Sequence, residues 1–239
     1  VKIFRQAQES KIVTTAHSIN KSIMPDLTNK ITDDLFFMKL YNEEVIGNTV
    51  IDLVTNRLPK KYNVRPSDIQ VLTPMKISSL GSEVLNEKLQ FIINPIGDYI
   101  QYGNTIFRMG DKVMQIKNNY ENGVFNGDTG YITDVNTEEK TVSVIFKNNT
   151  ILYQKTELDE LMLAYSCTIH KSQGSEYDIV VIPIFRSQKR MLQRNLLYTA
   201  ITRAKKLCIL VGDEKMFEYG VNNIEVDNRL TSLKDFLLK

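Results

Sequence analysis

Residues 163–206 decide the fold, and they read LAYSCTIHKSQGSEYDIVVIPIFRSQKRMLQRNLLYTAITRAKK. Three apolar runs lie in or beside this stretch, at residues 161–167, 179–184 and 207–211. Polar or helical connections separate the runs, an arrangement typical of the buried strands of a parallel α/β sheet. Because ligands of such sheets bind beyond the carboxyl ends of the strands, the polar loop 168–176 is predicted to lie at a binding site.

The loop 168–176 concentrates hydrogen-bond donors, a chemistry that suits phosphate oxygens. A glycine that frees the backbone follows the donors. Between residues 168 and 206, eight Lys or Arg and two acidic residues give a net charge of +6, whereas the whole chain carries +2. Concentrated positive charge favours a polyanionic partner, but basic residues on a helix also occur as an ordinary solvated face, so charge alone leaves both readings open. The donors and the glycine are Thr168, His170, Lys171, Ser172, Gln173 and Gly174.

The same stretch resembles motifs V and VI of superfamily-one helicases, which are ATP-driven translocases on nucleic acid. The pattern T-x-H-K-S-Q-G-S-E followed by Y-T-A-I-T-R-A is most similar to the RecD/TraA type. Members of that type move 5′→3′ on single-stranded DNA and include the alpha subunit of exodeoxyribonuclease V. The resemblance therefore implies the C-terminal motor half of such a DNA helicase.

Roles for individual residues follow from the resemblance. Arg203 is implied as the arginine finger that contacts the γ-phosphate of ATP, a role that suits a guanidinium because it stays charged and donates in a fork. Such fingers contribute about 10³–10⁵ in rate. Gln173, Gly174 and Glu176 are implied to link the nucleotide to the DNA. The residues implied to approach the DNA strand are Thr168, His170, Lys171 and Ser172.

Two further stretches carry the resemblance. In FRQA, Arg5 corresponds to the motif IV arginine, a second γ-phosphate contact, although without the family it reads as a surface residue. The stretch VLTPMK and the helix after it imply Thr73, Lys76 and Asn86 as DNA-side residues. Each of these three also fits a strand-end turn or an exposed helix position.

Residues 104–158 change character, because short alternating strands alternate with turns such as Asn-Gly and Asn-Gly-Asp, and no helix intervenes. This pattern predicts a small β-barrel inserted into the α/β domain. It resembles the SH3-like barrel of RecD-type helicases, which begins at FRMGDKVMQ and contains NGDxG. Candidate DNA contacts on the barrel, each equally readable as part of a structural insertion, are Phe107, Lys117, Asn118 and Tyr120.

The predicted fold class is thus α/β: a RecA-like parallel sheet flanked by helices, with an inserted small SH3-like β-barrel. The motor domain is predicted over residues 1–103 and 159–239, and the barrel over 104–158. Local patterns also predict a short strand at 11–15 and a helix at 42–58 that ends before Pro59.

The chain is predicted to lack its own ATP-hydrolysing machinery. No glycine is followed by lysine anywhere, so the phosphate-loop pattern G-x-x-x-x-G-K-[ST] is absent. Asp213 and Glu214 follow a strand as Walker B carboxylates do, but without that loop they are predicted to cap the next helix. ATP and Mg²⁺ are therefore expected to be held mainly by an N-terminal motor domain of a longer protein, consistent with Val1 in place of Met, and no metal site is expected here.

The expected partners are single-stranded DNA and that N-terminal motor domain. No apolar run approaches the ~20 residues that span a bilayer, and no signal peptide is expected. Cys167 and Cys208 lie in predicted strands and read as reduced core thiols, so a cytoplasmic protein is expected.

Three other functions compete with a helicase part. A stand-alone nucleic-acid-binding module does not need the intact Gln173, Glu176 and Arg203. A nuclease needs clustered Asp, Glu and His with two-metal spacing, which the sequence does not display. A protein-interaction role in a repair complex is compatible with the sequence as an additional function.

Overall fold

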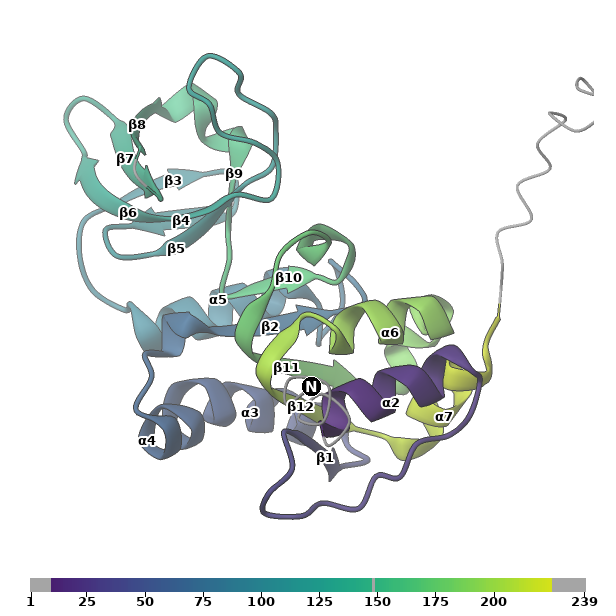
Figure 1. Ribbon diagram of the computed structural model, residues 1–239. Helices are drawn as coiled ribbons and strands as arrows, with labels where there is room; N and C mark the ends of the chain where they lie inside the picture. Colours follow the sequence, from purple (N-terminus) through teal and green to yellow (C-terminus); the bar gives the residue numbers. More distant parts are fainter. Residues whose placement is uncertain (1–9, 148, 225–239) are drawn as a thin grey trace, which may run out of the picture.

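The computed structural model describes residues 10–147 and 149–224. A sheet with helices on both faces forms one part of the molecule, and a β-rich part stands over one end of it (Figure 1). Arg5 lies outside the described residues, so its predicted phosphate contact stays a prediction.

The central sheet is parallel and five-stranded, in the order β1-β12-β11-β2-β10. All four neighbouring pairs run parallel, so the carboxyl ends of the five strands meet at one edge. This confirms the predicted parallel sheet. The strands are β1 Leu35–Lys39, β2 Ile69–Thr73, β10 Ser166–Thr168, β11 Tyr177–Ile184 and β12 Ala204–Gly212.

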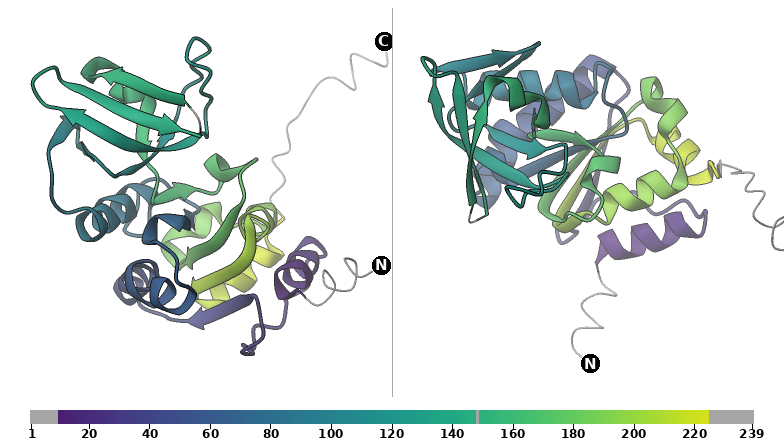
Figure 2. Two further views of the ribbon diagram at one scale, coloured as in Figure 1. Left: turned by 60° about the vertical axis from the view of Figure 1, so that its left-hand side comes forward. Right: turned by 90° about the horizontal axis from the view of Figure 1, so that it is seen from above.

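Helices cover both faces of this sheet because its strands are apolar on both sides. Along β12, Leu207 and Ile209 belong to one buried cluster, while Cys208 and Leu210 belong to the other. The first cluster includes residues of α3 and α5, and the second includes residues of α2, α6 and α7, so the two sets lie on opposite faces (Figure 2, left). The helices are α2 Lys11–Asn20, α3 Glu43–Asp52, α4 Leu58–Tyr62, α5 Ser82–Ile93, α6 Arg194–Ile201 and α7 Glu214–Asn222.

The predicted strand at 11–15 is wrong, because this segment begins helix α2. Ser10 caps the helix by accepting a hydrogen bond from the Val13 N–H at 3.3 Å. Ile12, Ala16 and Ile19 recur at helical spacing and are buried. The β-branched run Ile-Val-Thr-Thr suggested a strand, but the packing of this helical face decided the structure.

The helix predicted to end before Pro59 continues past it. A π-helical turn, Leu53–Arg57, joins α3 to α4, and the Leu58 N–H donates to the Leu53 carbonyl, five residues back. Pro59 then lies in the first turn of α4, a position at which the missing N–H of proline is tolerated. The helix ends at Asn63, which has a left-handed φ of 52°.

The β-rich part contains a five-stranded antiparallel sheet, β8-β7-β6-β5-β9, and a separate β3-β4 hairpin. Among the described residues, strand pairing does not join the hairpin to the sheet, so a closed barrel ladder is not seen. Its strands extend a few residues beyond the predicted 104–158 at both ends. They are β3 Tyr99–Tyr102, β4 Thr105–Arg108, β5 Lys112–Gln115, β6 Thr129–Asn136, β7 Thr141–Phe146, β8 Asn149–Gln154 and β9 Leu161–Leu163.

The apolar run 161–167 divides between the two parts of the molecule, with β9 paired to β5 and β10 paired to β2. Asn86 of α5 secures this crossing point. Its amide donates to the carbonyls of Leu163 at 2.8 Å and Ser166 at 2.9 Å, and its Oδ1 accepts from the Ser166 N–H at 2.7 Å.

A buried carboxylate joins α5 to the β-rich part. Asp111 accepts hydrogen bonds from the side chains of Gln90 at 2.5 Å and Asn94 at 2.8 Å, both on α5. The Tyr165 hydroxyl, at 3.0 Å, and the Arg108 N–H, at 2.7 Å, donate to the same carboxylate. Burial raises the pKa of Asp111, and these four donors oppose the rise.

Lys112 makes the neighbouring contact between the two parts. Its buried ammonium donates to the Ser67 carbonyl at 2.9 Å and to Gln70 Oε1 at 3.1 Å. Burial lowers the pKa of Lys112 from 10.5 to about 8, and the negative charge of Asp68 only partly opposes this.

A pH dependence of stability follows from Lys112. Between about pH 8 and 10.5 the unfolded chain binds this proton more tightly than the folded protein does, so the contribution of Lys112 to stability rises with pH across that window. Relative to Lys112→Met, which shares every other titrating group, we expect the wild type to gain about 2–3 kcal/mol, measured by urea unfolding at several pH values. Lys60→Met, at an exposed lysine, should keep the gain. Parallel profiles for Lys112→Met and the wild type would contradict the assignment.

The free edge of the central sheet is capped. The side chain of Asn29 accepts from the Phe37 N–H and donates to the Phe37 carbonyl, both at 2.9 Å, so its amide occupies the outward backbone groups in the middle of β1. At the opposite edge, β10 is only three residues long.

Candidate nucleotide and nucleic-acid interface

The loop 168–176 runs from one edge of the sheet to the other. It leaves the carboxyl end of β10, where the Ile169 N–H donates to the Thr73 carbonyl at 3.0 Å. It reaches the amino end of β11, where the Tyr177 N–H donates to the Arg203 carbonyl at 2.8 Å. Only the first part of the loop thus lies at the carboxyl edge. Sequence reasoning placed all of it there, but a parallel strand must begin again at the opposite edge.

The predicted donors of this loop divide into scaffold and surface. Ser172 is buried and its hydroxyl donates to the Ile169 carbonyl at 2.7 Å, so it holds the turn. Thr168 Oγ1 is half-buried and accepts from the Lys171 N–H at 3.4 Å. His170 and Gln173 are exposed. The groups free to meet a ligand are therefore fewer than the sequence suggested.

Lys171 lies near a second cation. Burial lowers its pKa, and the positive charge of Lys76 lowers it further. Lys76 is exposed and pairs with Glu83 at 3.0 Å. The positive charges of Lys171 and Lys76 therefore repel each other, which favours an anion beside them.

A turn of the β-rich part approaches the same place. A Cβ added at Gly127 would lie 4.0 Å from the Lys171 carbonyl. Next to this turn, Tyr120 is 77% exposed and packs edge-on against Phe125, with ring centroids 5.9 Å apart. Exposed aromatic rings beside cations are the usual elements of single-strand binding surfaces.

The other predicted contacts of the β-rich part differ in exposure. Lys117 is exposed and paired with Asp159, and Asn118 Oδ1 accepts from the Asn126 N–H at 2.9 Å. Phe107 is buried in the core, which leaves it no free surface for DNA.

Thr73 and Asn86, expected on the DNA side, are also buried and fully engaged. Thr73 Oγ1 donates to the Leu80 carbonyl at 2.7 Å and accepts from the amide of Gln188 at 3.1 Å. The amide of Asn86 spans the crossing between β9 and β10. Their burial and bonds give both residues a positioning role, so we leave them out of the proposed DNA surface.

Arg203 stands at the amino edge, between α6 and β12. Its guanidinium donates to the Ser175 carbonyl at 2.9 Å and to the Thr199 carbonyl at 3.3 Å. The nearby carboxylate of Glu176 is paired with another cation, Lys205, at 3.3 Å. Arg203 is half-buried, and its hydrogen bonds go to uncharged oxygens, so its charge is not neutralised by a carboxylate. The predicted finger and the exposed Glu176 are thus brought together by Ser175.

Sequence reasoning missed a polar network at the carboxyl edge. Gln188 is buried, and besides its bond to Thr73 its Oε1 accepts from the Phe185 N–H at 3.0 Å. Glu43, in the first turn of α3, accepts from the hydroxyls of Ser79 and Ser187. The network fixes the loop after β2 beside the segment after β11. The one signal in the sequence was a lone glutamine among exposed basic residues.

The cysteines and the residues after β12 lie as predicted in the described part of the chain. Cys167 and Cys208 are buried free thiols, and Asp213 caps α7 by accepting from the Lys215 N–H, as expected. In residues 10–147 and 149–224, no three His, Cys, Asp or Glu side chains gather where they could hold a metal ion. None of the helices described there has the length and apolar character needed to cross a membrane.

Comparison with known families matches two segments of the chain. Residues 85–146 match the SH3 domain of ATP-dependent RecD-like DNA helicases, and residues 163–211 match the UvrD-like helicase C-terminal domain. The two matched segments are thus similar to the SH3 domain of RecD-like helicases and to the C-terminal domain of UvrD-like helicases. The first segment contains Asp111, whose carboxylate joins α5 to the β-rich part, and the second contains both the loop 168–176 and Arg203.

Relatives of this RecD-like chain are longer proteins. It is 33% identical over 217 residues to the ATP-dependent RecD2 DNA helicase of Deinococcus radiodurans, an alignment that covers 90% of the chain and 28% of the relative. It is 28% identical to the RecBCD enzyme subunit RecD of Buchnera aphidicola, covering 90% of the chain and 39% of that subunit. The chain therefore spans well under half the length of these relatives.

Solved helicase structures share the fold. The Pif1 helicase from Candida albicans superposes with a TM-score of 0.52 and 15% identity, covering 87% of the RecD-like chain and 56% of the Pif1 chain. A structure of two coordinating Pif1 helicases at forked double-stranded DNA gives 0.51 and 16%, covering 95% and 51%. The RecA-like class predicted for the parallel sheet is thus confirmed.

Proposed function

We propose that this RecD-like chain is the C-terminal part of an ATP-dependent helicase that moves 5′→3′ on single-stranded DNA. The observation that carries the proposal is the path of the loop 168–176. One end presents exposed donors at the carboxyl edge of the sheet, and the other end holds Arg203 at the amino edge through the Ser175 carbonyl. One continuous loop therefore carries exposed donors suited to DNA at one end and contacts the guanidinium of Arg203 at the other.

At the nucleotide side, Arg203 is proposed to contact the γ-phosphate of ATP bound to the N-terminal motor domain. The guanidinium is half-buried and preorganised by two carbonyl oxygens, so little reorganisation is needed before it donates to a phosphate. Gln173, Gly174 and Glu176 lie on the same loop, and Gly174 has a left-handed φ of +84°. Movement of this turn would transmit closure around ATP to the DNA side.

ATP and Mg²⁺ fit this chain only in part. The sequence offers no phosphate loop, and the described residues offer no carboxylate cluster for a metal. Arg203 fits as a donor to a nucleotide held from the opposite side. We therefore assign the cradle for ATP and Mg²⁺ to the N-terminal motor domain, and ATP supplies the free energy for movement once it is bound there.

At the DNA side, the proposed surface combines His170, Lys171 and Lys76 with Tyr120 of the β-rich part. The lysines suit the phosphates and the exposed ring suits stacking on bases. Thr168 and Ser172 support this surface by fixing the turn that carries it. The two buried free thiols agree with a reducing compartment, and we place the activity in the cytoplasm.

A DNA-binding measurement tests the proposal. In the full-length protein, His170→Ala combined with Lys171→Gln should weaken binding of an oligo-dT strand about tenfold or more, because at least one phosphate contact is lost. The slope of log K against log salt should also fall in magnitude by about 0.7. Fluorescence anisotropy titrations at several salt concentrations would measure both quantities.

The matched control is Lys155→Gln, which removes one exposed charge from the segment Lys155–Glu160 of the β-rich part and should change neither value. Unchanged affinity in the double variant would remove the carboxyl-edge loop from the DNA surface. A wild-type protein that does not bind the strand at all would favour the protein-interaction role instead.

A further inference from the structure

Three exposed cations follow the carboxyl end of β11. They lie on η5, a 3₁₀ segment over Arg186–Met191, and are Arg186, Lys189 and Arg190. No carboxylate of the described residues forms an ion pair with any of them. At the amino edge, by contrast, Lys205 and Lys206 are paired with Glu176 and Asp178. No ion pair among the described residues therefore compensates the positive charge of η5.

The η5 cations stand on a rigid base. Gln188, the buried residue of the segment, is bonded to Thr73 and to the Phe185 N–H. The Arg186 guanidinium lies 5.3 Å from the centroid of the Phe185 ring, and the Lys189 ammonium lies 4.8 Å from that of Tyr219. Aromatic faces hold these cations without neutralising them.

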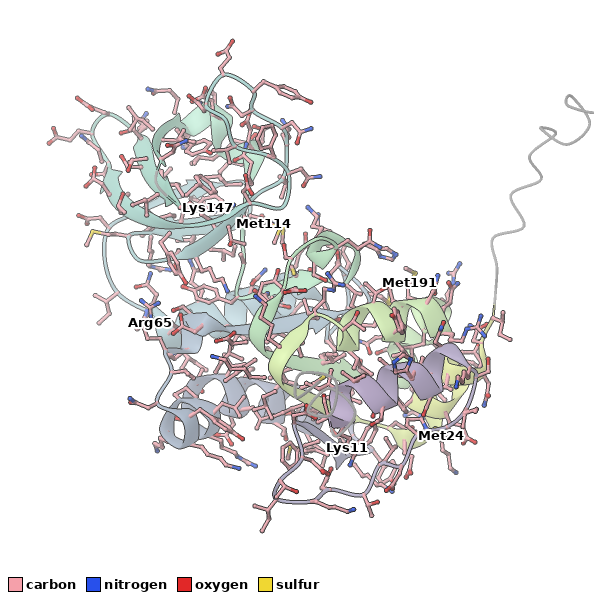
Figure 3. The ribbon with its side chains drawn as sticks, in the orientation of Figure 1. Lys11, Met24, Arg65, Met114, Lys147 and Met191 are labelled. Carbon is pink, nitrogen blue, oxygen red and sulfur yellow. The ribbon has the colours of Figure 1, made fainter. Side chains whose placement is uncertain are left out.

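This cluster continues the proposed DNA surface. The strands β10, β2 and β11 are consecutive neighbours in the sheet, and Lys171, Lys76 and η5 follow their carboxyl ends in that order. The carboxylate of Glu43 accepts hydrogen bonds from both Ser79, in the loop after β2, and Ser187, in η5, at 2.5 Å for the latter. The loop after β2 and η5 are therefore directly adjacent. Met191, the last residue of η5, is labelled in Figure 3 beside α6.

We propose that η5 is a second phosphate-binding surface, on which Arg186, Lys189 and Arg190 hold the sugar–phosphate backbone of the single strand. This inference rests on the proposed function, because it extends the same strand past Lys171 and Lys76. Two strand spacings separate β10 from β11, about 10 Å, which an extended single strand covers in about two nucleotides. The ligand is the polyanionic backbone, so no base preference is expected.

The experiment is a length series. Binding of oligo-dT strands of about 4 to 16 nucleotides to the full-length protein is measured by anisotropy at several salt concentrations. The variant carries Arg186→Gln, Lys189→Gln and Arg190→Gln together. We expect its affinity to stop increasing at a length about two to three nucleotides shorter than in the wild type. Its salt slope at the longest strand should be smaller in magnitude by about 2, since three phosphate contacts are lost.

Matched controls separate this inference from the proposed function. Lys60→Gln, Lys140→Gln and Lys155→Gln together remove three exposed charges from α4 and the β-rich part, and should leave the length profile unchanged. Thermal unfolding of both triple variants checks the fold. An η5 variant with the wild-type profile and slope would overturn the inference, and so would an equal loss at every strand length. The proposed function would still stand if the His170 and Lys171 variant remained defective.

Discussion

Replacing Arg203 by alanine in the full-length protein is expected to lower DNA-stimulated ATP turnover by about 10³-fold or more. The guanidinium donates to uncharged oxygens, chiefly the Ser175 and Thr199 carbonyls, so no carboxylate neutralises its charge. Binding of single-stranded DNA should change by less than about threefold, because the exposed donors of the loop lie at the other edge. Steady-state hydrolysis and anisotropy titrations on the same preparation would separate the two effects.

Two controls sharpen the experiment. Arg203→Lys keeps the charge but loses the planar fork, so it should also be strongly impaired. Lys205→Ala removes a neighbouring exposed cation, whose pairing with Glu176 contributes little, and should retain near-normal turnover. Near-normal turnover in Arg203→Ala would exclude the finger role and leave a nucleic-acid-binding module as the better description.

The second large effect is expected at Gly212, where β12 ends. Its φ is +149°, and an added Cβ would lie 1.8 Å from the Ile184 carbonyl oxygen on β11. The backbone on both sides is engaged, because the Leu40 N–H donates to the Gly212 carbonyl and the Asp213 N–H donates to the Ile184 carbonyl. Gly212→Ala should therefore destabilise the fold by about 4 kcal/mol, through steric overlap combined with backbone strain.

Gly97→Ala is the matched control for this prediction. Gly97 also has a positive φ, of +122°, but an added Cβ there meets no atom within 4 Å. Gly97→Ala should therefore lower the free energy of unfolding only by the conformational strain that it introduces, about 1–3 kcal/mol. Urea unfolding of both variants measures the difference, and equal losses would show that the close approach of β11 and β12 relaxes at little cost.

The parallel sheet could be predicted from the sequence because its strands are long apolar runs bounded by polar segments. The run 161–167 illustrates the limit of that reasoning. Its composition is uniformly apolar, yet β9 and β10 belong to different sheets. Only the pairing with β5 and β2, far away in the sequence, divides the run. Helix α2 and the passage of a helix through Pro59 were missed for a similar reason, because packing and a π turn overrode local propensity.

The site was predicted in its residue types more fully than in its geometry. Arg203 and the loop 168–176 do meet, through the Ser175 carbonyl. Thr73 and Asn86 are polar residues at strand and helix positions that could equally face outward, and the sequence does not show that β10 and Leu80 bury them. The η5 cations were counted as charge on a helix, but their unpaired state depends on where the carboxylates lie in space.

The capping of β1 has a consequence for self-association. A strand at the border of a sheet normally offers unpaired amide and carbonyl groups to which another molecule can add its own strand. Here the side-chain amide of Asn29 already fills the central position of that border, and the opposite border is too short to template a second copy. Both borders of the sheet are thereby guarded against edge-to-edge association with a second copy of the protein.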